Sequence, residues 1–160
     1  MASEESTDSV ERALWSLLAG GCFVAAASLF VVPFIGADEM WPNPLSSSDG
    51  AMGAAALLAA FLVGAACWLY VERHAERRYV RAGVLAGIVT GTVAHPLMWF
   101  LWGLLNGSIW MAILFLVPLF WVFGLLLFVW VTVPLAIGAG VFVGLLRVGA
   151  IRYQRRKRAE

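Results

Sequence analysis

Four long apolar stretches alternate with short polar segments along the 160-residue chain. A helix needs about 20 apolar residues to cross the ~30 Å hydrocarbon core of a bilayer, because each residue adds about 1.5 Å. Three stretches have roughly this length, and a fourth uncharged region, residues 108–146, exceeds it. The pattern predicts transmembrane helices at 13–37, 51–71, 82–105 and 125–146.

The surplus in the fourth region, residues 108–124, predicts either an outward extension of the last helix or a bent interfacial segment. Trp110 and Trp121 suit interfacial depth, and Pro118 permits a break. The main alternative is a fifth crossing within this region. It requires a tight turn near Gly124, where no polar side chain would satisfy the exposed backbone, so we favour four crossings.

Basic residues gather in two clusters, and cytoplasmic loops carry an excess of such residues. The first cluster lies between the second and third stretches, and the second lies in the tail, residues 147–160. Both are therefore expected inside the cell, together with the acidic N-terminal segment 1–12, whereas the loop 38–50 has no basic residue and is expected outside. The prediction is an all-α integral membrane protein, a compact four-helix bundle over 13–146 with both termini cytoplasmic, in the cell membrane.

Composition agrees with lipid as the main solvent. The chain is 62% hydrophobic, with a mean hydropathy of +0.86, and only 13% of its residues are charged. Soluble domains carry about 25% charged residues. The lipid bilayer is therefore the first expected partner.

Small residues recur at four-residue spacing in three of the predicted helices, which places each set on one helix face. In lipid, helices associate through close backbone approach and dispersion, so such seams predict tight packing within the chain, with a homo-oligomer or a larger membrane complex as the alternative. The predicted seam residues are Ala56, Ala60, Gly64, Gly83, Gly87, Gly91, Ala136, Gly140 and Gly144.

His95 continues the glycine row of the third stretch and precedes Pro96. The structural interpretation is a neutral imidazole that donates to a carbonyl of a neighbouring helix. The functional interpretation is a ligand or polar contact, with Thr92 and Trp99 as neighbours on the same helix.

Catalytic and metal-binding motifs are missing from the sequence. We therefore predict that the protein is not an enzyme and that it binds no metal and no cofactor. The predicted crossings contain no Asp, Glu, Lys or Arg, which argues against proton-coupled transport. Cys22 and Cys67 fall in apolar stretches and are expected to be small helix-face fillers. Glu72 and Glu76 alternate with Arg73 and Arg77, a pattern that predicts exposed ion pairs on helical extensions.

Three polar segments predict local features. Serines 46–48 before Asp49 predict an N-cap for the second crossing, and Asn106-Gly107-Ser108 predicts a turn. The basic tail predicts contacts with anionic lipid headgroups, at ~1 kcal/mol per residue near the surface, and no binding of nucleic acid. The predicted headgroup residues are Arg152, Arg155, Arg156, Lys157 and Arg158.

Three functions fit these features. The favoured one is a structural or accessory membrane component that packs through its small-residue seams. The second is a channel or facilitator for a small neutral or hydrophobic solute, with polar contacts from Thr90, Thr92, Thr132 and His95. The third is a haem- or quinone-binding redox subunit that uses His95; a bis-histidine haem would need His74, which lies among charges in the cytoplasmic loop.

Overall fold

The structure, a computed structural model, describes residues 2–36, 45, 47–74, 78–107, 110 and 117–159. Four long helices make up nearly all of this: α1 (Ala2–Ile35), α3 (Ser48–His74), α4 (Tyr79–Leu105) and α6 (Val117–Lys157). Each is long and apolar enough to cross a membrane. The all-helical class and the four candidate spans are therefore confirmed.

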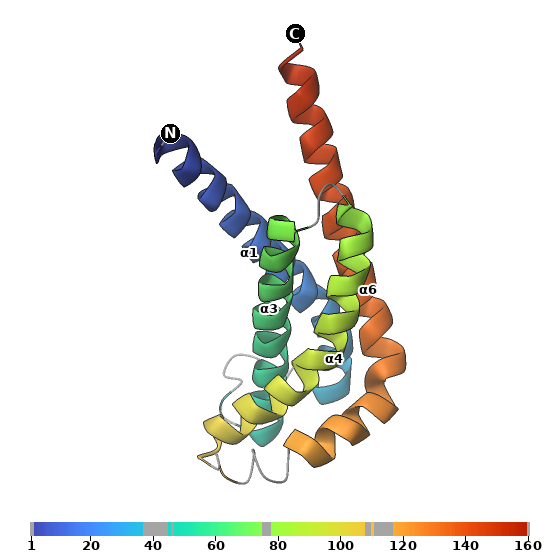
Figure 1. Ribbon diagram of the computed structural model, residues 1–160. Helices are drawn as coiled ribbons and strands as arrows, with labels where there is room; N and C mark the ends of the chain where they lie inside the picture. The colour runs from blue at the N-terminus through green and yellow to red at the C-terminus, as the bar shows by residue number, and fades with distance from the viewer. Residues whose placement is uncertain are drawn as a thin grey trace.

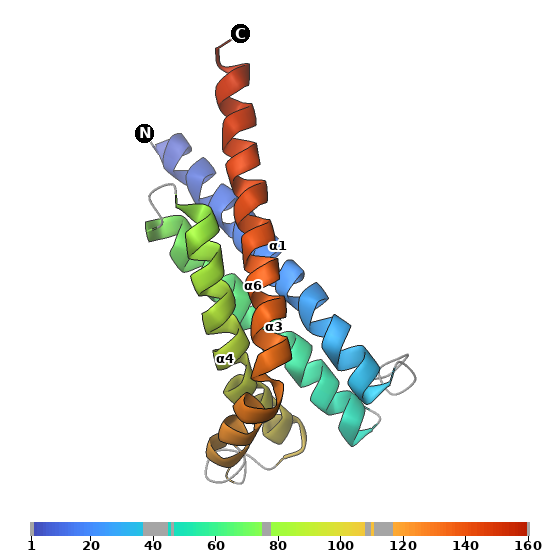
Figure 2. The same ribbon diagram turned by 90° about the vertical axis from the view of Figure 1, so that its right-hand side faces the viewer.

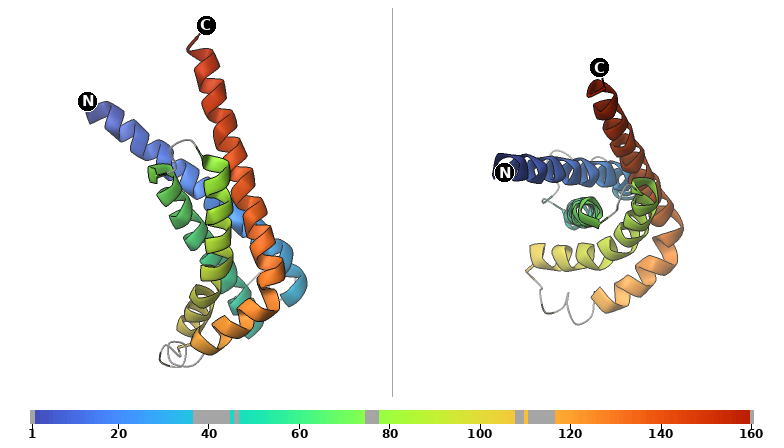
Figure 3. Two further views of the ribbon diagram at one scale, coloured as in Figure 1. Left: turned by 45° about the vertical axis from the view of Figure 1, so that its right-hand side comes forward. Right: turned by 45° about the horizontal axis from the view of Figure 1, so that its top comes forward.

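The helices form a closed ring in which each one runs antiparallel to the next (Figures 1 and 2). α1 packs on α3 and α6, and α4 packs on α3 and α6. The view with the top of the molecule turned forward shows α3 flanked by α1 and α4, with α6 on the far side (Figure 3). α1 begins and α6 ends at the same end of the ring, where α3 also ends and α4 begins (Figure 1).

α4 and α6 are bent near the end of the ring that is remote from the termini. There the last part of α4 and the first part of α6 turn aside from the direction of the rest of each helix (Figures 1 and 3). Each contains a proline, Pro96 in α4 and Pro134 in α6. Proline removes an amide donor and clashes with the carbonyl four residues earlier, which kinks a helix. The bends spread α4 and α6 apart at this end.

Helix ends follow local chemistry. The Ser47 hydroxyl accepts the amide of Gly50 at 3.0 Å, which confirms the predicted serine cap of α3. α1 and α4 are each followed by a residue with positive φ, Gly36 at 102° and Gly107 at 69°, whose amides bond back to the last helical turn. Asn106 and Gly107 form a turn, as predicted.

The helices are longer than the apolar stretches that predicted them. α1 includes most of the segment expected as an N-terminal tail, and α6 continues through the basic tail to Lys157. From Val117 onward, α6 is one uninterrupted helix, so the described part of the fourth region contains one span. The remaining residues of 108–116, apart from Trp110, lie outside the described residues.

Candidate ligand cavity

An apolar cavity of about 430 Å³ lies inside the ring, near the end remote from the termini. All four helices contribute to its wall: Phe23 to Ile35 in α1, Met52 to Ala60 in α3, Thr90 to Trp99 in α4 and Leu127 to Ala136 in α6. This volume falls within the range typical of small-molecule sites. We call this region the apolar end.

His95 lies in the cavity wall and is half-buried. Its Nδ1 is 2.9 Å from the carbonyl oxygen of Gly91, one turn earlier in α4. A carbonyl only accepts, so Nδ1 carries the proton, and in the neutral imidazole Nε2 keeps a lone pair as an acceptor. The expected bond to a neighbouring helix is thus replaced by one within α4, and the second ring nitrogen stays available for a ligand.

Thr90 supplies the complementary group. It is only 2% exposed, and it lines the cavity. Among the described residues its hydroxyl makes no conventional hydrogen bond, although it interacts weakly with the Cys67 thiol. Buried hydroxyls nearly always have a partner, so this one is poised to donate to a molecule in the cavity.

Aromatic rings from two helices form one wall of the cavity. Phe30 and Phe34 of α1 stack at 5.6 Å, and Phe128 of α6 meets both edge-on, at 5.3 and 5.5 Å between centroids. Phe34 is 59% exposed, so this wall also faces outward. Its rings close the space between α1 and α6 at the apolar end.

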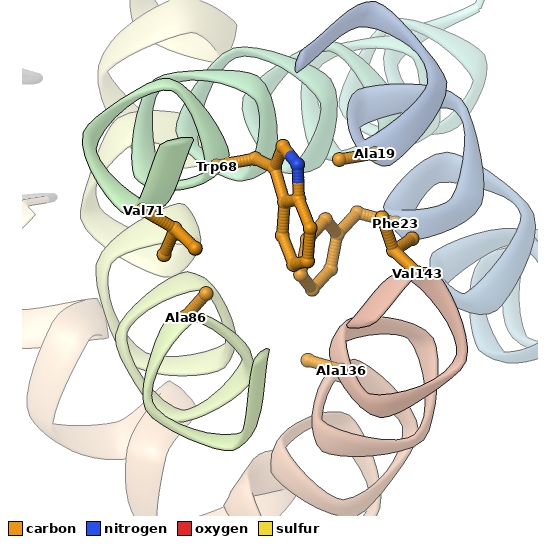
Figure 4. Close-up of a cluster of buried hydrophobic side chains, with 7 residues drawn as sticks. All are labelled: Ala19, Phe23, Trp68, Val71, Ala86, Ala136 and Val143. Atoms are coloured by element: carbon orange, nitrogen blue, oxygen red, sulfur yellow. The ribbon is translucent and has the colours of Figure 1, made fainter. Parts of the chain in front are cut away.

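Toward the termini, large side chains fill the middle of the ring. Trp68 and Phe23 meet there, surrounded by small and branched residues from all four helices (Figure 4). Trp68 is fully buried, and Phe23 both touches this core and lines the cavity. The cavity therefore ends at a hydrophobic plug, which we define as Phe23, Trp68 and Val143.

Beyond the plug, three charged side chains from three helices form an ion cluster: Arg147 of α6, Glu11 of α1 and Glu72 of α3. Arg147 donates through Nη1 to Glu11, and through Nη2 to Glu72 Oε2 at 3.0 Å. The side chain of Glu72 is 1% exposed and that of Arg147 is 10% exposed. We call this region of the ring the basic end.

Aromatic groups complete the cluster. The Arg147 guanidinium lies 5.0 Å from the Trp15 ring centroid and 5.7 Å from that of Tyr79, so α4 also contributes. The indole of Trp68 donates to Glu72 Oε1 at 3.2 Å. Cation–π contacts and charge-assisted hydrogen bonds partly offset the cost of removing these charges from water. The cluster thereby joins all four helices.

This cluster corrects one expectation from the sequence. Glu72 was expected in an exposed pair with a neighbouring arginine, but it is buried and binds Arg147 instead. The helices extend far enough that Glu11, Glu72 and Arg147 all lie within the candidate spans, so charges are present inside them. They stand just outside the crossings 13–37, 51–71 and 125–146 that the sequence predicts, so those crossings contain no charged residue and the expectation against proton-coupled transport stays a prediction. Glu76 and Arg77 lie outside the described residues.

The small-residue seams of α4 and α6 face each other. A Cβ at Gly83 would collide with the backbone carbonyl of Gly140, and one at Gly87 would collide with the backbone of Ala136 and Ile137. At Gly91 the nearest atom is the Val133 side chain, at 2.9 Å. The two helices are therefore closest at the basic end and separate toward the cavity.

The remaining small residues of the predicted seams lie either in contacts between helices or in the cavity wall. A Cβ at Gly64 would overlap the ring of Phe23 in α1, and Gly144 packs on the start of α4. Ala56, Ala60 and Ala136 line the cavity. The seams are thus used between helices of this chain and around its cavity.

The structure separates the residues proposed as neighbours of His95. Trp99 lines the cavity, and its ring meets that of Trp102 edge-on. Thr92 is half-buried, and its hydroxyl donates to the carbonyls of Ile88 and Val89 in its own helix. It does not line the cavity. Thr132 lines the cavity but donates to the Phe128 carbonyl, so Thr90 is the threonine available for a ligand.

Metal and haem chemistry find little support in the described residues. They contain no group of three His, Cys, Asp or Glu side chains placed to hold a metal ion. Cys22 and Cys67 are free thiols packed against the core. His74 lies at the end of α3 and stacks on Tyr70, so it offers no second axial ligand in the cavity of His95.

Comparison with known proteins adds no relative. No protein-family model, curated protein or solved structure matches the chain.

Proposed function

We propose that this chain is a multi-pass protein of the cell membrane whose interhelical cavity binds a small, neutral, mostly apolar molecule. The supporting observation is an apolar cavity whose wall carries a buried donor, the Thr90 hydroxyl, and an available acceptor, His95 Nε2. An apolar wall with few polar groups is the usual composition of a small-molecule site.

The polar groups of the wall define the ligand class. A charged molecule would lose its hydration without an opposite charge, because the described wall contains no Asp, Glu, Lys or Arg. A neutral oxygen function suits the site better, since a hydroxyl can accept from Thr90 or donate to His95. A quinone or ketone carbonyl can only accept, so it can bond to the Thr90 hydroxyl but not to His95 Nε2. The quinone alternative thus belongs to this ligand class.

Orientation follows from charge. The basic end carries the arginine clusters, so we propose that it faces the cytoplasm together with both termini. The cavity then lies in the outer half of the bilayer. Cysteine labelling at Arg158→Cys and Leu45→Cys tests this orientation. We expect an impermeant reagent added outside to label the second position only.

A direct test of the site uses 1-naphthol, a neutral aromatic alcohol, with the protein in nanodiscs. We expect saturable one-to-one binding above the lipid background. Thr90→Val and His95→Leu should each weaken it roughly tenfold, because each removes one hydrogen bond of about 1–1.5 kcal/mol. Thr92→Val is the matched control, since that threonine does not line the cavity. Binding that is unsaturable, or equal in all four proteins, would refute the proposal.

Facilitated passage is the wider function that the same site could serve. It requires the plug and the ion cluster to open, since they close the ring between the cavity and the basic end. The decisive measurement is solute flux into proteoliposomes. Flux that is unaffected by His95→Leu would remove His95 from the path.

The accessory role, in which this chain would pack with itself or with a larger membrane complex, has less support from the structure than from the sequence. The seams that motivated it lie between helices of this chain and around its cavity. A homo-oligomer or a larger complex stays a prediction, and mass spectrometry of the gently solubilised protein tests it.

A further inference from the structure

A second, smaller pocket lies at the basic end, where α4 begins beside the last turns of α6. It has a volume of about 150 Å³, and its lining residues are Tyr79 of α4 and Val148, Ile151, Arg152 and Arg155 of α6. It is distinct from the apolar cavity, with which it shares no residue.

The two arginines are three residues apart, which places them on one face of α6. Both are exposed, and within the described parts of the chain neither has a carboxylate partner. Two carboxylates that the structure describes at this end, Glu11 and Glu72, both bind Arg147. Among the described residues, the two arginines of the pocket therefore have no ion-pair partner.

The order of its side chains matches the cross-section of a lipid monolayer. Val148 and Ile151 lie nearer the middle of the span, and Arg155 lies nearer the end of α6. An aromatic ring with a hydroxyl, Tyr79, lies beside them, and tyrosine is enriched at the depth of the headgroups. The first amides of α4 begin at the same place and add partial positive charge.

We propose that this pocket binds an anionic phospholipid, with its phosphate between Arg152 and Arg155 and its glycerol region against Val148 and Ile151. Arginine forks match phosphate oxygens, and the apolar floor distinguishes a lipid from a free anion. A zwitterionic lipid fits less well, because the pocket lining offers no carboxylate for its amine.

The test is native mass spectrometry of the full chain, delipidated and titrated with phosphatidylglycerol or phosphatidylcholine. We expect the anionic lipid to bind at least roughly tenfold more tightly, and Arg152→Gln/Arg155→Gln to remove that preference. The matched control is Arg156→Gln/Arg158→Gln, which deletes the same charge outside the pocket and should change the preference less than about threefold.

Further arms separate the lipid from other sources of phosphate. Arg152→Lys/Arg155→Lys keeps the charge and should retain part of the preference, while circular dichroism checks that every variant is folded. Excess glycerol phosphate, which has no acyl chains, should not displace the lipid. Equal losses in the two Gln pairs would overturn the proposal as a diffuse charge effect, and displacement by glycerol phosphate would overturn it in favour of a soluble anion.

Discussion

The two ends of the helix ring enclose the same central space and fill it in opposite ways. At the basic end, Trp68 and the Arg147–Glu11–Glu72 cluster occupy the middle, so side chains from all four helices meet. At the apolar end the middle is a cavity of about 430 Å³. One end is thus a filled, charged junction, and the other is a hollow space with two polar atoms available for a ligand.

The contrast has a simple physical origin. The backbones of α4 and α6 approach most closely at Gly83 and Gly140, and the contact is looser at Gly91, where an added Cβ would lie 2.9 Å from Cγ2 and 3.0 Å from Cα of Val133. Beyond that point each helix bends, Pro96 being in one and Pro134 in the other. The sequence thus concentrates strong interactions at one end, which lets the other end stay open.

The largest expected effect is at the ion cluster. Arg147→Met would leave Glu72 buried without its cation, at a cost of about 3–5 kcal/mol in the free energy of unfolding. Titration with SDS in mixed micelles, followed by circular dichroism, measures this loss. Adding Glu72→Gln should recover part of it, because the uncompensated charge is then removed. A loss no larger than that of the exposed Arg156→Met would contradict a stabilising basic end.

The next largest effect is expected where α4 and α6 are closest, and it tests whether the two helices are closer at Gly83 than at Gly91. Gly83→Ala forces a methyl group against the Gly140 carbonyl and should destabilise the protein by up to about 3 kcal/mol. At Gly91 the added methyl group would lie 2.9 Å from Cγ2 and 3.0 Å from Cα of Val133, which is less severe than the overlap at Gly83, so the cost of Gly91→Ala should be smaller. Gly138→Ala is the control, because nothing lies within 4 Å of its added Cβ. Equal losses at Gly83 and Gly91 would mean that the helices do not diverge.

Neighbouring alanines of α3 give the sharpest comparison between filled and hollow space. Ala59 is fully buried outside the cavity, whereas Ala60 lines it. Ala59→Leu should cost about 1–3 kcal/mol through overpacking. Ala60→Leu should cost less and should weaken 1-naphthol binding, because its side chain enters the cavity. The same SDS titration and binding assay measure both variants, and the reverse order would show that no usable space exists.

The smallest expected effect on stability is at the cavity donor. Thr90→Val keeps the shape of the side chain and removes a hydroxyl that makes no conventional hydrogen bond. Without ligand, the free energy of unfolding should change by less than about 1 kcal/mol or increase, since an unsatisfied buried group is lost. A large loss would show that the weak contact with Cys67 is structurally important.

Most of the fold could be predicted from the sequence, because the length of an apolar stretch and the spacing of small residues are local properties. Four candidate spans, the Ser47 cap and the turn at Asn106 follow from such signals. The cavity could not be predicted, since its volume depends on how far the bent helices separate. His95 was singled out, but Thr90 was proposed only as one of several pore threonines.

The ion cluster was missed because its members stand at stretch ends and act there as topological signals. Arg147 is 75 residues from Glu72 and 136 residues from Glu11 in the sequence, which is too far for a local pattern to show the pairing. One signal was nevertheless present. Gly64, Trp68 and Glu72 follow one another at four-residue spacing, which turns by about 40° per step, so the carboxylate lies close to the face of α3 that carries Trp68.

The position of Arg147 also has a consequence for biosynthesis. Glu11 and Glu72 emerge from the ribosome before the cation that binds both of them. Until α6 is made, α1 and α3 carry the carboxylates of Glu11 and Glu72 without the guanidinium of Arg147 that binds both. The contacts that tie α1 and α3 to α6 can therefore form only after residue 147 has been synthesised, and a polypeptide that stops before it leaves Glu72 without its cation.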